Sequence, residues 1–230
     1  LDDEGTLTIR GTGETTSSQF YNNSEIKKVV IENGITKIGD YLFGKCYSLT
    51  SIEIPDSVRI IGDCSFQYCS SLTSIDMAYG VETIGKRAFE ECKSLTSVRL
   101  PDSVTLIDNS AFCECKKLKS IILPDNLTSI GFSAFMNCDS LTSLTIPEGV
   151  TSIGGFAFCS CDYLTDITLP STVTSIGLGA FEWCERLLSI KIPDSVTEIE
   201  ERTFANCRRL TSVTIPDSVT SIEKSAFKGC

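Results

Sequence analysis

The chain has 230 residues, of which 41% are hydrophobic, and this is enough apolar material to bury a core. Its 30 acidic residues outnumber the 20 basic ones and leave a net charge of -10, which argues against a nucleic-acid or anionic-membrane surface because phosphates require clustered Lys and Arg. Histidine is absent, which excludes Ser-His-Asp and Cys-His catalysis and removes the commonest zinc ligand.

Three residue types recur every 23 residues along most of the chain. Isoleucine occupies positions 38, 61, 84, 107, 130, 153, 176, 199 and 222, phenylalanine follows five residues later from Phe43 to Phe227, and cysteine follows from Cys46 to Cys230. An unbroken period of this length is typical of a solenoid, in which each unit stacks on its neighbours.

The first part of each unit predicts a strand. In the segment from Leu49 to Pro55, Ile52 and Ile54 alternate with Ser51 and Glu53, which is the period-2 pattern of a half-buried strand. Pro55 has no N–H to donate, so it belongs at the strand's end.

The second part of each unit predicts a short helical turn. Ala88, Phe89 and Cys92 have the spacing i, i+1 and i+4, which fits one helical or 3-10 turn laid on the core. The strands of successive units would form a parallel sheet, and the wider helical turns would curve the stack so that this sheet is concave. The sequence therefore predicts an α/β repeat solenoid.

The repeated string Leu-Thr-Ser-Ile-x-Ile-Pro-Asp-Ser-Val-Thr-Ser-Ile-Gly-x-x-Ala-Phe-x-x-Cys resembles the Treponema pallidum-type, or BspA-like, leucine-rich repeat. The resemblance covers residues 26–230, about nine repeats, and implies a right-handed leucine-rich-repeat superhelix. It also implies a secreted or cell-surface protein that serves adhesion or host contact. Residues 1–25 resemble the segment that often precedes such repeats and would cap the first rung.

The chain ends at Cys230 in mid-repeat and without a polar cap. We therefore expect either that the natural protein continues or that another chain covers this end.

Nine of the twelve cysteines belong to the repeat, and we expect them to be buried free thiols that behave as small hydrophobic side chains. The others are Cys64, Cys113 and Cys159, and the spacing of the two C-x-C pairs argues against a shared zinc ion. No phosphate-binding loop or catalytic dyad is apparent, so we predict neither enzymatic activity nor a cofactor.

Two surfaces are predicted to bind a partner. On the concave sheet, the outward positions are mostly Thr and Ser, and the departures from that pattern are Glu53, Asp76, Arg99, Lys119, Ile122, Asp166, Leu188 and Lys191. On the turn side, the middle rungs carry an apolar flank of Phe132, Met136, Phe156, Leu178 and Trp183. Clustered apolar residues at exposed positions indicate an interface, although the same residues could also tuck under neighbouring turns.

The function predicted from these features is an extracellular or cell-surface scaffold that binds a protein or glycoprotein. The alternative is a non-catalytic spacer or targeting module of a larger surface or secreted protein. Self-association through the open carboxyl end or the apolar flank is also expected. No apolar run is long enough for a transmembrane segment.

Overall fold

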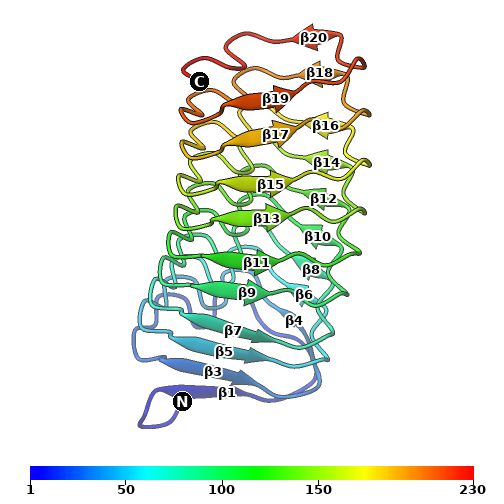
Figure 1. The fold of residues 1–230 in the computed structure, drawn as a ribbon. Helices are drawn as coiled ribbons and strands as arrows, with labels where there is room; N and C mark the ends of the chain where they lie inside the picture. The colour runs from blue at the N-terminus through cyan, green and yellow to red at the C-terminus, as the bar shows by residue number, and fades with distance from the viewer.

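Each 23-residue repeat contributes one rung to a straight-sided column of stacked chain turns (Figure 1). The computed structural model describes residues 1–230, and the amino terminus lies at one end of the column and the carboxyl terminus at the other. Wherever two strands pair, the pairing is parallel and joins equivalent strands of neighbouring rungs, as the repeat requires.

The first side of the column, here called the long-strand face, carries the odd-numbered strands (Figure 1). These are β1 (Thr6–Ile9), β3 (Lys28–Ile31), β5 (Ser51–Ile54), β7 (Ser74–Met77), β9 (Ser97–Arg99), β11 (Ser120–Ile122), β13 (Ser143–Thr145), β15 (Asp166–Thr168), β17 (Ser189–Lys191) and β19 (Ser212–Thr214). The ladder is continuous from β1 to β7 and then proceeds in pairs, β9 with β11, β13 with β15, and β17 with β19.

The second side carries the even-numbered strands. These are β2 (Gly13–Glu14), β4 (Ile35–Ile38), β6 (Ile60–Ile61), β8 (Thr83–Ile84), β10 (Leu106–Ile107), β12 (Ser129–Ile130), β14 (Ser152–Ile153), β16 (Ser175–Ile176), β18 (Glu198–Ile199) and β20 (Ser221–Ile222). Strands β2 to β16 form one sheet, and β18 pairs with β20. The regular 23-residue spacing of the isoleucines places one of them in the core at the end of each of these strands from β4 to β18.

The third side of the column is here called the turn side. The sequence predicted a helical or 3-10 turn there, and this prediction is wrong because no helix or 3-10 turn forms. The fold is therefore all β instead of α/β. In a typical rung, Arg87 (φ 54°) and Glu91 (φ 63°) adopt the left-handed conformation, which a right-handed helix cannot contain. The main-chain N–H of Phe89 instead donates to the carbonyl of Ala111 in the next rung, at 2.8 Å. All three sides of the column are hydrogen-bonded from rung to rung at one spacing. Helical turns wider than the strands, which were expected to curve the column, are missing.

The core contains a continuous stack of phenylalanine rings. From Phe20 to Phe227, the ring of each rung lies 5.2–5.7 Å from the ring of the next, and adjacent rings are within 18° of parallel. The eight rings from Phe43 to Phe204 are fully buried, and Ile, Leu, Val, Ala and Cys side chains complete the same core. The Phe column that defines the repeat is therefore also the axis of its packing.

The amino-terminal segment adds a layer of the same kind. Strand β1 pairs with β3, β2 pairs with β4, and Phe20 continues the phenylalanine stack. Its capping role remains a prediction. No helix in the structure is long and apolar enough to span a lipid bilayer.

Candidate protein-interaction surfaces

The long-strand face holds all eight residues that the sequence predicted for it, and all eight are exposed. Five of them share the outward column at the third strand position, where Glu53, Asp76, Arg99, Ile122 and Lys191 stand. Asp166 begins β15, and Lys119 and Leu188 each directly precede a strand. The period-2 reading of the strands is confirmed, because Ile52 and Ile54 point into the core while Glu53 faces solvent.

The threonines that precede the strands have a structural role. The hydroxyl of Thr50 donates to the carbonyl of Lys27 in the previous rung, and the hydroxyl of Thr73 donates in the same way to Thr50. Such hydroxyls add a second donor alongside the main-chain N–H of the same residue. Lys119 and Leu188 replace threonine in this column and lack that hydroxyl, so local structure does not account for them.

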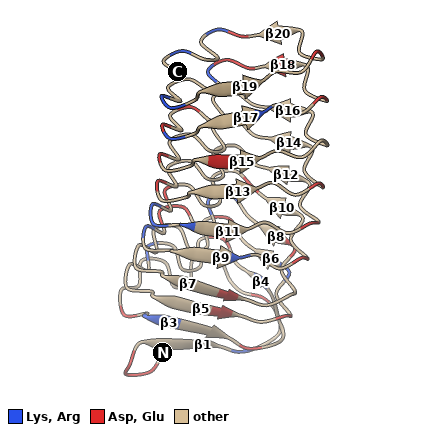
Figure 2. Cartoon of the chain, viewed as in Figure 1, with Lys and Arg blue, Asp and Glu red and all other residues tan.

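Charge on this face is grouped along the column (Figure 2). The carboxylates of Glu53 and Asp76 stand in register on adjacent strands, and Lys28 pairs with Glu53 at 2.6 Å. Arg99 then stands in register with Ile122, an isoleucine that is 61% exposed. An acidic zone is therefore followed by a basic and apolar zone, which is a pattern that a complementary partner can read.

Sequence reasoning missed a cavity of about 380 Å³ between β7 and β9, where the long-strand ladder is interrupted. Asp76 and Arg99 line it, together with the half-exposed Met77 and the Tyr79 ring. The signal was present in the sequence, since Ala78 replaces the proline that follows most strands of the repeat.

On the turn side, the structure brings together three residues of the predicted apolar flank. Phe132 and Phe156 are in edge-to-face contact, with ring centroids 5.5 Å apart, and Leu178 occupies the next rung. A Cβ on Gly155 would lie 3.2 Å from the Phe132 ring, so that ring rests on the neighbouring glycine. One face of the Phe132 ring is thus covered by the neighbouring turn while the side chain remains 50% exposed, and a role of this flank in binding stays a prediction.

The other two flank residues lie further along the turn. Met136 is half-buried, and Trp183 is 38% exposed with the Arg208 guanidinium 5.4 Å from the centre of its ring. Cys113 and Cys159, which occupy the position of Met136 in the rungs on either side of it, are buried, and burial raises the pKa of the Cys113 thiol to about 12. A protonated thiol is a weak nucleophile, so these positions are suited to packing.

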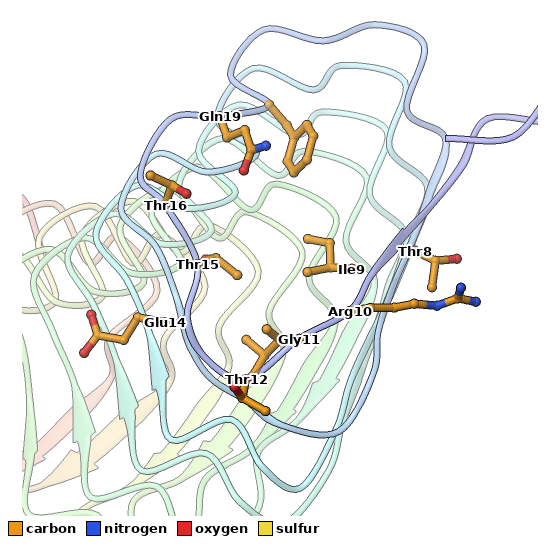
Figure 3. A pocket seen from close by; sticks show the side chains of 11 residues that line it. Thr8, Ile9, Arg10, Gly11, Thr12, Glu14, Thr15, Thr16 and Gln19 are labelled. Carbon is orange, nitrogen blue, oxygen red and sulfur yellow. The ribbon is translucent and has the colours of Figure 1, made fainter.

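A second cavity, of about 330 Å³, opens at the amino-terminal end of the column (Figure 3). Ile9 points toward its interior, and Arg10 and Glu14 extend away from it on opposite sides. Ile9, Phe20 and Ile35 provide its apolar lining, so it is the end of the core layer described above.

The repeat pattern and the column have direct counterparts among known proteins. The family model for the BspA type leucine rich repeat region matches residues 10–119 and 105–230, and so covers nearly the whole chain. The chain belongs to the BspA-type leucine-rich-repeat family. A search of curated protein sequences finds no match.

Solved structures of leucine-rich repeat proteins share the architecture. A leucine-rich repeat protein from Bacteroides ovatus is 23% identical over 98% of this chain and 84% of its own, with a TM-score of 0.60. A leucine rich cell surface protein from Faecalibacterium prausnitzii is 30% identical over 98% of this chain and 76% of its own, with a TM-score of 0.50. A leucine-rich repeat protein from Eubacterium ventriosum is 21% identical over 100% and 91%, with a TM-score of 0.56. This BspA-type chain is a repeat scaffold of a kind consistent with protein interaction.

Proposed function

We propose that this BspA-type domain is an extracellular or cell-surface binding scaffold, and that a protein or glycoprotein ligand binds along its long-strand face. The observation that carries the proposal is the set of departures on that face. The third strand position is Thr145, Thr168 and Thr214 in other rungs, whereas the exposed side chains of Arg99, Ile122 and Lys191 form no hydrogen bond or ion pair within the chain.

The arrangement of these side chains suits recognition of an extended surface. Arg99 and Ile122 occupy adjacent rungs, about 4.8 Å apart by strand spacing, and Leu188 adds a second exposed aliphatic residue further along. Exposed apolar residues within a charged rim resemble the anchors of protein interfaces. A rigid ladder holds them in place, so little conformational entropy is lost when a ligand binds.

Likeness to a protein described as a leucine rich cell surface protein, at 30% identity, supports placement at the cell surface. The fold itself supports the prediction that the chain is not an enzyme, since a repeat column of this family usually serves as a scaffold.

The test is an array of extracellular matrix proteins and glycoproteins probed with the wild-type chain and with a triple variant, Arg99→Ser, Ile122→Ser and Lys191→Ser. Glu198→Ser is the matched control, because Glu198 is also exposed but lies on β18, on the second side of the column. The proposal expects that the wild-type chain binds a ligand, that the triple variant binds it with an affinity at least about tenfold lower, and that the control binds it as the wild-type chain does. No bound ligand, or equal binding by all three proteins, would instead favour a spacer role.

A further inference from the structure

The turn side presents a straight column of side chains, one from each rung, that the proposed ligand face does not use. This turn column runs in the order Asp63, Lys86, Asn109, Phe132, Gly155, Leu178, Glu201 and Lys224. The main-chain carbonyl of each column residue accepts a hydrogen bond from an N–H of the preceding rung. Examples are Ser110 N–H to Phe132 O at 2.8 Å and Phe156 N–H to Leu178 O at 2.8 Å. The column residues are therefore evenly spaced, at about 4.8 Å per rung.

The middle of the turn column is apolar and open to solvent. Phe132 is 50% exposed and Leu178 is 38% exposed, and Phe156 packs edge-to-face on Phe132 from the adjacent position. The ring of Phe156 rests on Gly179, where a Cβ would come within 2.5 Å of it, in the same way that Phe132 rests on Gly155. These contacts seat both rings against the column and leave an apolar platform of Phe132, Phe156 and Leu178.

The charges at the two ends of the turn column are complementary to each other. Asp63 and Lys86 precede the platform, and Glu201 and Lys224 follow it. If a second column is laid antiparallel on the first, with the two-fold axis between the rungs of Phe132 and Gly155, Lys86 faces Glu201 and Asp63 faces Lys224. The two-fold axis repeats each pair, so four opposite-charge pairs flank the two platforms.

We propose that the turn column is a self-association surface, and that its occupant is a second copy of this chain in this antiparallel register. A copy is the fitting partner because its rungs have the same spacing, which keeps the outer charge pairs aligned over the whole distance from Asp63 to Lys224. In this register Phe132 of each copy faces Gly155 of the other, beside Phe156, while Leu178 faces Asn109, so the two-fold interface removes the aromatic part of both platforms from water.

The charges select one register among its neighbours. A shift of the two-fold axis by half a rung toward the carboxyl end places Lys86 opposite Lys224, and the same shift in the other direction places Asp63 opposite Glu201. A parallel arrangement would set every charge against its own copy. Like charges that face each other across an interface disfavour the alternative arrangements.

One like-charge pair remains in the proposed register, because Arg87 faces Arg202 beside the turn column. Each guanidinium already lies near a carboxylate of its own chain, with Arg87 Nε 3.8 Å from Glu90 and Arg202 Nε 3.7 Å from Glu201. Both arginines are exposed and can turn away from the interface. Their repulsion is therefore weaker than the attraction of the four facing pairs.

Sedimentation equilibrium of the purified chain tests the proposal by charge exchange. We expect a monomer–dimer equilibrium in which Lys86→Glu alone and Glu201→Lys alone each raise the dimer dissociation constant by about tenfold or more. The double variant, Lys86→Glu with Glu201→Lys, restores opposite charges in the proposed register and should return the constant to near the wild-type value. Glu198→Lys is the control, because it makes the same charge change on an exposed side chain of β18.

Replacement of Phe132 by Ser provides an independent variant, which should weaken the dimer by more than about tenfold while thermal unfolding shows that the chain remains folded. A wild-type chain that stays monomeric at concentrations of about 100 μM would overturn the proposal. So would a double charge variant that dimerises no more tightly than either single variant. Because the ligand assay uses a different side of the column, either proposal can fail without the other.

Discussion

The thiol of Cys138 donates a hydrogen bond to the main-chain carbonyl of Phe112, one rung earlier in the column, with an Sγ–O distance of 3.3 Å. The same carbonyl accepts the N–H of Cys115 at 3.3 Å. All nine repeat cysteines make the equivalent bond, from Cys46 to Phe20 at 3.2 Å through to Cys230 to Phe204 at 3.1 Å. The cysteine column therefore joins rung to rung as well as filling space in the core.

Replacement of Cys138 by Ala should lower the free energy of unfolding by about 1–2 kcal/mol, because it removes a buried donor and leaves a small cavity. The matched control is Cys230→Ala, in which the same bond is lost from an exposed residue and the expected change is below about 0.5 kcal/mol. Urea unfolding followed by circular dichroism measures both. Equal decreases in the free energy of unfolding at the two positions would show that burial of the thiol and its hydrogen bond contributes nothing.

Burial of the thiols predicts that the fold loses stability in alkali. Desolvation raises the pKa of Cys46 to about 11 and that of Cys207 to about 12, against an ordinary value of 9.0. Above pH 9.0 the unfolded chain releases thiol protons that the folded chain retains, so the free energy of unfolding falls as pH rises. The fall is about 1.4 kcal/mol per pH unit for each such thiol, until the pH reaches its folded pKa.

Urea titrations at a series of pH values on either side of the ordinary thiol pKa measure this dependence. The expected result is a constant stability below that pKa and a steep decline above it. A free energy of unfolding that does not change across the alkaline range would contradict the burial of the thiols.

The phenylalanine stack should respond to truncation far more strongly than the exposed aromatic residues. Phe112 lies between Phe89 and Phe135, at ring distances of 5.4 and 5.6 Å, and is fully buried. Phe112→Ala should cost about 3–5 kcal/mol of unfolding free energy. Phe132→Ala is the comparison, with an expected cost of about 1 kcal/mol because half of that side chain is already in water. Similar costs at both positions would mean that Phe132 belongs to the core.

The repeat isoleucines, phenylalanines and cysteines sufficed to predict a column of parallel rungs, because residues 23 apart must occupy equivalent places. The alternation of Ile52 and Ile54 with polar neighbours also predicted correctly which side chains of the long strands face solvent. Both inferences depend only on periodicity, which the sequence states directly.

The turn side could not be predicted in the same way. Ala88, Phe89 and Cys92 have helical spacing, but bonds to the next rung, such as Phe89 N–H to Ala111 O, alternate with bonds inside the turn, such as Cys92 N–H to Phe89 O, so no helix closes. This bonding requires Arg87 and Glu91 to adopt the left-handed backbone conformation. Arg and Glu are not residue types that predict that conformation from sequence. Tertiary hydrogen bonding therefore overrode local spacing. The cavity between β7 and β9 was missed although Ala78 interrupts the repeat proline, because one substitution in a turn does not show that strand pairing breaks beside it.

Asp139 should weaken the fold when it is ionised. Desolvation raises the pKa of its carboxyl, and Lys116, 4.0 Å away, opposes that shift only in part. Because the pKa of this carboxyl is higher in the folded chain than in the unfolded chain, the folded chain binds its proton more tightly. The free energy of unfolding should therefore rise as pH falls through the folded pKa. Asp139→Asn removes the titration and should raise the free energy of unfolding near neutral pH by at most about 1 kcal/mol, because the carboxyl is only partly buried and solvent screens it.

The difference between Asp139→Asn and the wild-type chain should shrink in acid, where both side chains are neutral. Differential scanning calorimetry at neutral and acidic pH measures it. A variant less stable than the wild-type chain at neutral pH would indicate that the Lys116–Asp139 ion pair outweighs desolvation.

Hydroxyl-radical footprinting with and without a ligand from the matrix-protein array tests the role of the long-strand face most directly. Ile122, 61% exposed on β11, reports on that face, and Ile60, 40% exposed on β6, is a reference of the same residue type on the second side of the column. If the ligand binds as proposed, oxidation of Ile122 should fall severalfold in the complex while that of Ile60 is unchanged. Protection of Ile60 without protection of Ile122 would contradict the account.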